Sequence, residues 1–372
     1  MIRFLHTSDW QIGMKGGGLG QAGALVAKKR IETIDRLLSI AEEHGADFVL
    51  AAGDLFEDNR VSYSDVEAVA RIIRDHPDVE IHAIPGNHDL PGPGSVWNRS
   101  ALSGIPNLIV HLKAGPVKVR NGVTLHPFPV FSRYSSTDPL SNLPDLAQSE
   151  GIHIGMAHGS LTTVAFGRDE EGITLPLDPA HVERAGLDYL ALGHWHGTRL
   201  IDADGSRCRI AYSGTHEQTS FEEVDAGNIL IVEIEEKGSI PKVEVIRSGQ
   251  LTWGNEQVEF VEDANLDRLR RLLETANFNL LRLELSGVLA ESLYSEYQRL
   301  LEGARARFLD LRVRDEKLHW QTDDKAPLTL TDASLEEVLR RLQGLHTAGT
   351  AEPATVREAI RLFEEFAKEA GL

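Results

Sequence analysis

The chain has 372 residues, and at ~100–200 residues per domain this length suggests two domains, or one large domain with an appendage. Its 38 basic and 57 acidic side chains give a net charge of −19, which argues against broad, nonspecific attraction to nucleic acid or anionic membranes. Cys208 is the single cysteine, so the composition excludes an intrachain disulfide and a cysteine-built metal site. We expect a cytoplasmic protein with no signal peptide and no membrane span.

Residues 1–236 alternate strands and helices, which predicts an α/β sandwich with mixed β-sheets as the first domain. The opening order is βαβα, with apolar runs for the strands and a 3.6-residue period for the helices. Shorter strands follow. The expected strands are 2–7, 48–52, 80–84, 108–112, 123–128, 152–157, 189–192, 209–212 and 229–233, and the expected helices are 31–41, 66–73 and 180–185.

The pattern changes after residue 236. Residues 237–325 predict a smaller α+β domain, with strands at 258–260, 281–285 and 308–313 and helices at 266–275 and 292–304. Residues 326–372 predict two amphipathic helices, each preceded by a capping-box pattern. The two boxes are Ser334 with Glu337, and Thr355 with Glu358.

Two irregular segments interrupt the first domain. Residues 13–23 contain six glycines, and because no phosphate-binding GxxxxGK[ST] pattern is present we expect a mobile loop. Residues 127–144 are rich in proline, serine and aromatic residues and predict a long loop. Long ordered loops are often functional.

Five short segments have the same layout, in which an apolar strand is followed at once by side chains that can bind a metal. In α/β sheets the carboxyl ends of neighbouring strands open onto one crevice, so five such strand ends could meet at one place. The segments are Ser8-Asp9-Trp10-Gln11, Gly53-Asp54-Leu55-Phe56, Gly86-Asn87-His88-Asp89, Ala157-His158-Gly159 and Gly193-His194-Trp195-His196.

The candidate metal ligands are oxygen and imidazole nitrogen atoms without a thiolate. This set suits Mn²⁺, Fe²⁺ or Zn²⁺ better than a site made only of oxygen, and we expect Mn²⁺, with Mg²⁺ as a further alternative. There are too many ligands for one tetrahedral ion. Two ions ~3.5–4 Å apart form the clamp used for in-line displacement at phosphorus. The predicted ligands are Asp9, Gln11, Asp54, Asn87, His158, His194 and His196.

These segments resemble the calcineurin-like metallophosphoesterase family, whose pattern is D-x-H, G-D, G-N-H-D or -E, H and G-H-x-H. The match covers roughly residues 1–235. Finer features look like the SbcD-type branch of DNA-repair nucleases. They are Leu5-His6-Thr7-Ser8-Asp9-Trp10, Gly53-Asp54-Leu55-Phe56, Gly193-His194-Trp195-His196 and Tyr212-Ser213-Gly214. The resemblance implies two mixed β-sheets flanked by helices, followed by a small α+β capping domain.

The resemblance also implies how the metal ligands divide between two ions. Asp9 and His196 would bind the first ion, and Asp54 would bridge both. The second ion would be held by three further side chains, those of Asn87, His158 and His194.

His88 and Asp89 are the predicted catalytic residues. The resemblance implies that His88 contacts the scissile phosphate or protonates the leaving oxygen, with Asp89 beside it. Because Asn87 and His88 are successive, they are not expected to face the same ion, which also favours a non-ligand role for His88. An imidazole with a near-neutral pKa suits proton transfer.

Two positions depart from the family pattern. Gln11 stands where the family usually has histidine, and it would either offer its side-chain oxygen to a weaker first metal site or bond a metal-bound water. His216 follows Tyr212-Ser213-Gly214 where serine and proline are more common, and we expect it in a surface turn. Elsewhere, Trp10 is expected to pack, and Arg312 and Arg314 either meet phosphates or pair with neighbouring acids.

We therefore expect a dinuclear-metal phosphodiesterase that cleaves DNA by in-line attack of a metal-bridging hydroxide. The resemblance implies DNA and an SbcC-type coiled-coil ATPase as partners, and a homodimer is left open. Two alternatives remain. One is a phosphodiesterase of nucleotides or other small phosphodiesters, and the other is a nonenzymatic DNA-end or scaffold subunit with a weakened first metal site.

Overall fold

The computed structural model describes residues 1–14, 19–20, 22–164, 175–261, 265–321 and 333–348, and four residue pairs beyond them, 355–356, 359–360, 362–363 and 366–367. Most of the second predicted C-terminal helix and part of the glycine-rich segment 13–23 lie outside these residues. Two compact units can be separated. The first contains Met1–Gln257, Arg271–Glu284 and Glu302–Arg314, and the second Val258–Arg270, Leu285–Leu301 and Asp315–Leu372.

The first unit contains two six-stranded sheets. In the first sheet the strand order is β14-β13-β1-β2-β3-β4, with β1 to β4 parallel and β13 antiparallel to both β1 and β14. The apolar runs of the sequence correctly locate its central strands. Its members are β1 (Ile2–Thr7), β2 (Phe48–Ala52), β3 (Ile81–Ile84), β4 (Leu108–Val110), β13 (Asn228–Ile234) and β14 (Lys242–Arg247).

The second sheet has the order β11-β12-β10-β7-β6-β5, with four parallel central strands and an antiparallel strand at each edge. A two-stranded sheet of β8 (Ser160–Leu161) and β9 (Pro176–Leu177) follows β7 along the chain. The six strands are β5 (Val117–Arg120), β6 (Val123–Phe128), β7 (Ile152–His158), β10 (Tyr189–Gly193), β11 (Arg199–Ile201) and β12 (Ile210–Tyr212).

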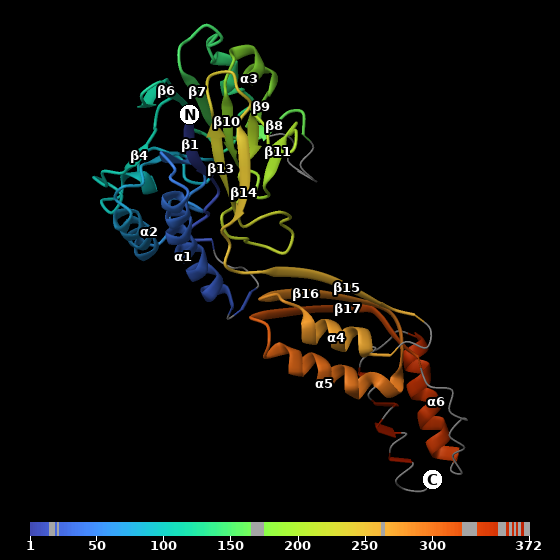
Figure 1. Ribbon diagram of the computed structural model, residues 1–372. Coiled ribbons are helices and arrows are strands. Elements are labelled where there is room, and N and C mark those ends of the chain that lie inside the picture. The colour runs from blue at the N-terminus through green and yellow to red at the C-terminus, as the bar shows by residue number, and fades with distance from the viewer. Residues whose placement is uncertain are drawn as a thin grey trace. The chain divides into compact units, whose positions relative to one another are not determined.

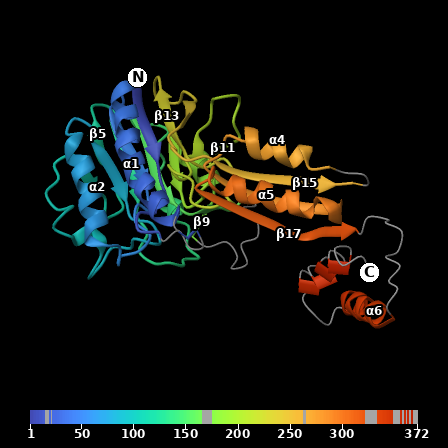
Figure 2. The ribbon, with the colours of Figure 1, turned by 90° about the horizontal axis from the view of Figure 1, so that it is seen from below.

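The two sheets face each other across a buried apolar core, in which Phe4 and Phe48 stack with ring centroids 5.3 Å apart. Helices α1 (Ala22–Glu43) and α2 (Tyr63–Asp75) lie side by side and cover the outer face of the first sheet (Figures 1 and 2). The outer face of the second sheet packs against α3 (Ala180–Ala185) and the 3₁₀ turn η2 (Pro139–Asn142). This arrangement confirms the predicted α/β fold with mixed sheets flanked by helices.

The remaining elements form a three-stranded sheet with helices. The sheet has the order β15-β16-β17, and the buried Tyr297 hydroxyl of α5 donates to Asp315 of β17 at 2.6 Å. No helix among the described residues combines the length and the apolar character needed to cross a bilayer. The predicted domain boundaries at residues 236 and 325 stay a prediction. The elements are β15 (Trp253–Phe260), α4 (Asp267–Thr275), β16 (Leu280–Ala290), α5 (Tyr294–Arg305), β17 (Asp310–Gln321) and α6 (Ala333–Ala348), with short 3₁₀ turns η1 (Val96–Asn98) and η3 (Glu291–Leu293).

The core between the two sheets predicts a strong dependence of stability on Leu50, which lies in the middle of β2 and is fully buried. Replacing it with alanine should lower the free energy of unfolding by about 2–5 kcal/mol, because the change leaves a cavity between two sheets that cannot collapse freely. Urea denaturation measures this. The control is Val245→Ala on the edge strand β14, where the side chain is 46% exposed and little change is expected. Equal stability of the two variants would contradict the assignment of this core.

Candidate metal centre

The predicted ligand segments lie at the carboxyl ends of strands from both large sheets. Asp9 and Asp54 follow β1 and β2 of the first sheet, and Asn87 follows β3. His158 ends β7, and His194 follows β10, in the second sheet. Hydrogen bonds join the two sets, since His158 Nδ1 donates to the Ala52 carbonyl at 2.8 Å. The structure therefore brings together strand ends that are far apart in the sequence. This agrees with the expectation that the carboxyl ends of neighbouring strands open onto one crevice.

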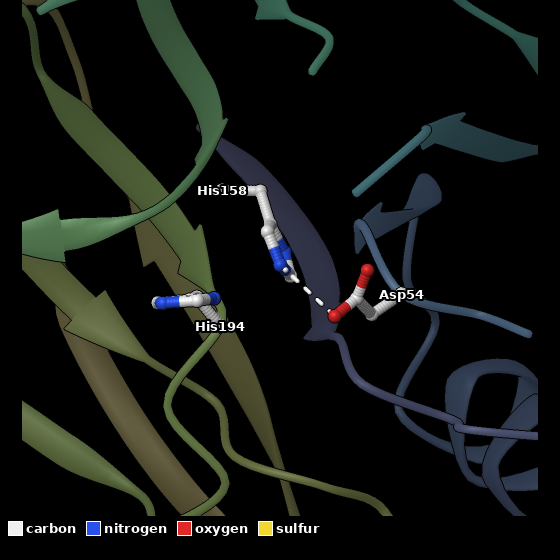
Figure 3. Close-up of side chains that lie close together, drawn as sticks. All are labelled: Asp54, His158 and His194. Atoms are coloured by element: carbon white, nitrogen blue, oxygen red, sulfur yellow. Dashed lines mark ion pairs between the residues drawn. The ribbon is translucent and has the colours of Figure 1, made fainter. Parts of the chain in front are cut away.

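Asp54, His158 and His194 form the centre of this site (Figure 3). Each offers one ligand atom, and the three atoms lie within 4.8 Å of one another. His158 Nε2 is 3.2 Å from Asp54 Oδ2. Asn87 joins them, because its side-chain oxygen is 3.0 Å from His158 Nε2 and 3.1 Å from His194 Nδ1. Four side chains thus direct nitrogen and oxygen atoms at one small region.

Asp9 is buried beside this group. Its carboxylate accepts hydrogen bonds from Ser8 Oγ at 2.5 Å and from the backbone N–H of His194 at 3.1 Å. Burial raises the pKa of Asp9, although the charges of His158 and His196 oppose this shift. Asp9 and His196, the two ligands predicted for one ion, therefore act on each other electrostatically.

Gln11 contacts the centre through its amide. Gln11 Nε2 donates to Asp54 Oδ2 at 3.4 Å, while Gln11 Oε1 is buried and has no protein partner. An unpaired buried acceptor costs free energy unless something binds it. A divalent cation beside Asp54 would satisfy this oxygen, so the residues present fit a metal ion at this position.

Burial and pairing shift the pKa values of the central residues in opposite directions. Burial alone would raise the pKa of Asp54, but the charge and hydrogen bond of His158 hold it well below its usual range. The same pairing overcomes burial at His158 and raises its pKa to about 9. Burial, with the charge of His158, lowers the pKa of His194 to about 3. A protonated imidazole thus balances buried carboxylates, and a divalent cation can supply the same positive charge.

Backbone strain is concentrated in the same segments. The φ angles of Asp9, Gln11 and Asp54 are 51°, 50° and 54°, and that of His194 is 100°. Residues with a side chain rarely adopt these values, and they persist where surrounding bonds enforce them. Here Asp9 N donates to the Gly53 carbonyl at 2.9 Å, and Gln11 N donates to the Asp54 carbonyl at 3.0 Å. The loops are therefore held in the conformation that aims their side chains at one point.

Two glycines of the ligand segments, Gly86 and Gly193, are required by this packing. A Cβ atom on Gly86 would lie 2.1 Å from Asp54 Oδ1 and 2.6 Å from the Asp54 backbone nitrogen. A Cβ atom on Gly193 would lie 2.1 Å from the Ala52 carbonyl oxygen. These backbone atoms cannot yield, so a side chain at either position would displace Asp54 or separate the strand ends.

His88 and Asp89 have different surroundings. His88 is half-buried, its N–H donates to Asp54 Oδ1 at 2.9 Å, and its Nδ1 donates to the Glu57 carbonyl at 2.9 Å. Asp89 is fully buried and accepts from the N–H groups of Gly86 at 2.7 Å and Leu55 at 2.9 Å. Burial, with the charge of Asp54, raises the pKa of Asp89 to about 7. Asp89 therefore joins two site loops, and its predicted catalytic role stays a prediction.

Glu223 is a residue of the site that the sequence reasoning misses. Glu223 Oε1 accepts from His196 Nδ1 at 2.6 Å, and its other oxygen accepts from the backbone N–H of Thr219 at 2.6 Å. This pairing leaves His196 Nε2 as the free ring nitrogen. The loop after β12 that carries Glu223 matches none of the motif spacings, so no sequence signal marked it.

Trp10 is fully buried and donates to Thr7 Oγ1 at 3.0 Å, which confirms that it packs. The expectation of a surface turn at His216 is wrong, because its ring is fully buried and contacts the Arg30 carbonyl at 2.8 Å. The centroid of the His216 ring lies 5.9 Å from that of the buried Trp10 ring. Of the two alternatives for Arg312 and Arg314, the structure shows pairing with acids, at 2.8 Å to Asp310 and 3.2 Å to Glu284.

A pair of mixed sheets between helices, with carboxylates and imidazoles gathered at the strand ends, is an arrangement that suits metal-dependent phosphoester hydrolysis. The family model for calcineurin-like phosphoesterases matches residues 2–198, and the chain belongs to this family.

Curated relatives resemble the chain to different extents. The uncharacterized metallophosphoesterase YhaO of Bacillus subtilis is 23% identical over 99% of this chain and 95% of its own length. The DNA double-strand break repair protein Mre11 of Saccharolobus solfataricus is 26% identical over 60% of this chain and 57% of its own length. Among solved structures, TT1561 of Thermus thermophilus has a TM-score of 0.42 and 14% identity over 66% of this chain and 99% of that protein.

The Glu223 contact predicts a change in the titration of His196. Burial lowers the pKa of His196, but the hydrogen bond to Glu223 and the charge of Asp9 outweigh burial and raise it. Glu223→Gln should therefore lower this pKa in the metal-free protein, which histidine-selective NMR can follow. The control is Glu222→Gln, since Glu222 instead pairs with Arg282 at 2.7 Å. The same His196 pKa in both variants would show that Glu223 does not act on this imidazole.

Proposed function

We propose that the protein is a dinuclear-metal phosphodiesterase that cleaves DNA in the cytoplasm, as a DNA-repair nuclease of the SbcD type. The observation that carries the proposal is the convergence of Asp54, His158 and His194 on one point, with Asn87 bonded to both imidazoles. DNA as substrate is supported by the likeness to two archaeal proteins named DNA double-strand break repair protein Mre11.

In this proposal the ligands divide as the family pattern implies. Asp9, His196 and the amide oxygen of Gln11 would hold the first ion. The second ion would be held by three residues, Asn87, His158 and His194. Asp54 would be a ligand of both ions. When bound, two such cations neutralise phosphate charge and lower the pKa of a water they share. We expect Mn²⁺, because the donors combine imidazole nitrogen with carboxylate and amide oxygen.

His88 is proposed to move the proton of the leaving oxygen. A carbonyl oxygen can only accept, so the contact with Glu57 O means that His88 Nδ1 carries a hydrogen. The other ring nitrogen, Nε2, is then the atom that exchanges a proton with the substrate. The bond from His88 N to Asp54 Oδ1 fixes the residue beside the centre without making it a ligand.

The partners are proposals as well. An SbcC-type coiled-coil ATPase would compensate for the net charge of −19, which leaves the chain without an electrostatic grip on DNA. Helix α6 is a candidate docking element, since its side chains Val338 and Leu345 are exposed. A second copy of the chain is the other candidate occupant.

The proposal is tested by incubating the purified protein with Mn²⁺ and two substrates, labelled linear DNA and bis-p-nitrophenyl phosphate. Both should be cleaved, and EDTA should abolish both activities. His88→Gln should lower the rate by about 10²–10⁴-fold, the usual contribution of a proton-transfer group, without loss of Mn²⁺ affinity measured by calorimetry.

Three results would count against the proposal. Cleavage of the small diester alone, with the ATPase present, would identify a small-phosphodiester enzyme. Binding of DNA without turnover of either substrate would identify a scaffold subunit. Full activity of the His88→Gln variant would remove the role given to His88.

A further inference from the structure

The long loop after β6 exposes two aromatic side chains close together in the chain. Phe131 is 63% exposed and Tyr134 is 64% exposed, and Ser132 and Arg133 between them are exposed too. Aromatic side chains usually contribute their large apolar area to the core. We call Phe131-Ser132-Arg133-Tyr134 the aromatic segment. Single exposed apolar residues are common, but two aromatic rings flanking an arginine are a specific combination.

The start of the aromatic segment is attached to the loop that carries two site residues. The N–H of Val130 donates to the Pro85 carbonyl at 3.1 Å. Pro85 directly precedes Gly86, Asn87 and His88. Phe131 therefore follows a residue that is bonded to the base of the Asn87 loop.

The end of the aromatic segment is joined by hydrogen bonds to the chain that follows His158, a predicted ligand from the second sheet. The Ser135 carbonyl accepts from the N–H of Leu175 at 3.1 Å, and the Leu175 carbonyl accepts from the N–H of Ser160 at 3.0 Å. Ser160 lies two residues after His158. The aromatic segment thus connects the base of the Asn87 loop with the chain that follows His158.

The charge of Arg133 acts on a third site loop. Burial raises the pKa of Asp58, but its hydrogen bonds with Arg60 and the charges of Arg60 and Arg133 lower it. Asp58 follows Glu57, whose carbonyl oxygen holds His88. Arg133 thus adds an exposed cation to the aromatic segment, and side chains of this kind bind backbone phosphates.

We propose that Phe131 and Tyr134 are a stacking platform for unpaired bases of a nucleic-acid strand, with Arg133 contacting its backbone. The inference rests on the proposed function and narrows its substrate to single-stranded or frayed ends, because bases inside a duplex are already stacked and paired. Aromatic rings accept every base, since each base has a π-face. Stacking also suits an acidic chain, because it does not depend on positive charge.

Another exposed aromatic ring in the same unit does not share these features. Tyr63 begins α2 and is 78% exposed, but the guanidinium of Arg99 lies 4.7 Å from its ring centroid. Arg99 in turn donates to the carbonyl oxygens of Asn59 and Val61 at 2.7 and 2.6 Å. One face of the Tyr63 ring is thus occupied by Arg99, which also binds the loop of Asn59 and Val61.

The test compares two fluorescent oligonucleotides of the same length, oligo-dT and an abasic strand, by anisotropy with the full-length metal-free protein. Phe131→Ala/Tyr134→Ala should weaken binding of oligo-dT by at least about 5-fold, the lower end for one stacked base, and leave the abasic strand unchanged. The matched control is the exchange variant Phe131→Tyr/Tyr134→Phe, which keeps both rings and should bind like the wild type. Arg133→Gln should weaken both strands alike.

A second double variant controls for loss of the native fold. Phe131→Leu/Tyr134→Leu keeps apolar bulk and should lose the same preference for bases. Wild-type affinity for oligo-dT in the alanine or leucine variant, or an equal loss for the abasic strand, would overturn the platform. Absence of DNA cleavage together with base-dependent binding would contradict the proposed nuclease while supporting the platform.

Discussion

Buried carboxylates that need a positive counter-charge are the constraint on which the site depends. Asp9 and Asp54 are almost completely removed from water, and the charge of Asp54 adds to the cost of ionising Asp9. The protein alone supplies a protonated His158 and backbone N–H groups as compensation. A buried charge is tolerated only when it is paired. The arrangement is therefore suited to cations, and the strained loops and close-approach glycines keep the carboxylates in place.

Much of the fold and of the site can be predicted from two sequence patterns, the apolar runs and the positions of possible ligands after them. Continuous apolar runs correctly locate β1, β2 and β6, and ligands placed directly after such runs do meet at the strand ends. Edge strands are harder to predict: β14 has several exposed residues, weakens the apolar pattern, and is absent from the predicted elements. The contact between Glu223 and His196 depends on how a loop folds back, and no residue spacing encodes it. Likewise, the burial of His216 depends on packing against the helix that carries Arg30.

The acidic composition gains a more specific meaning from the structure. A net charge of −19 argues against a general electrostatic attraction to nucleic acid, yet part of that charge lies in the candidate metal-binding residues. Cations bound there would reverse the local field where a phosphate must sit. Stacking of bases on the proposed platform of the aromatic segment would add affinity that salt does not screen. On this account substrate recognition is local, through metals and stacked bases, and a partner supplies the longer contacts.

The most direct test of the central claim is anomalous X-ray diffraction at the manganese edge, from crystals grown with Mn²⁺. The account predicts two anomalous peaks at the junction of the two large sheets, both within ligand distance of Asp54. One should contact His158 and His194, and the other Asp9 and His196. No peak beside Asp54, or manganese bound only elsewhere on the protein, would contradict it.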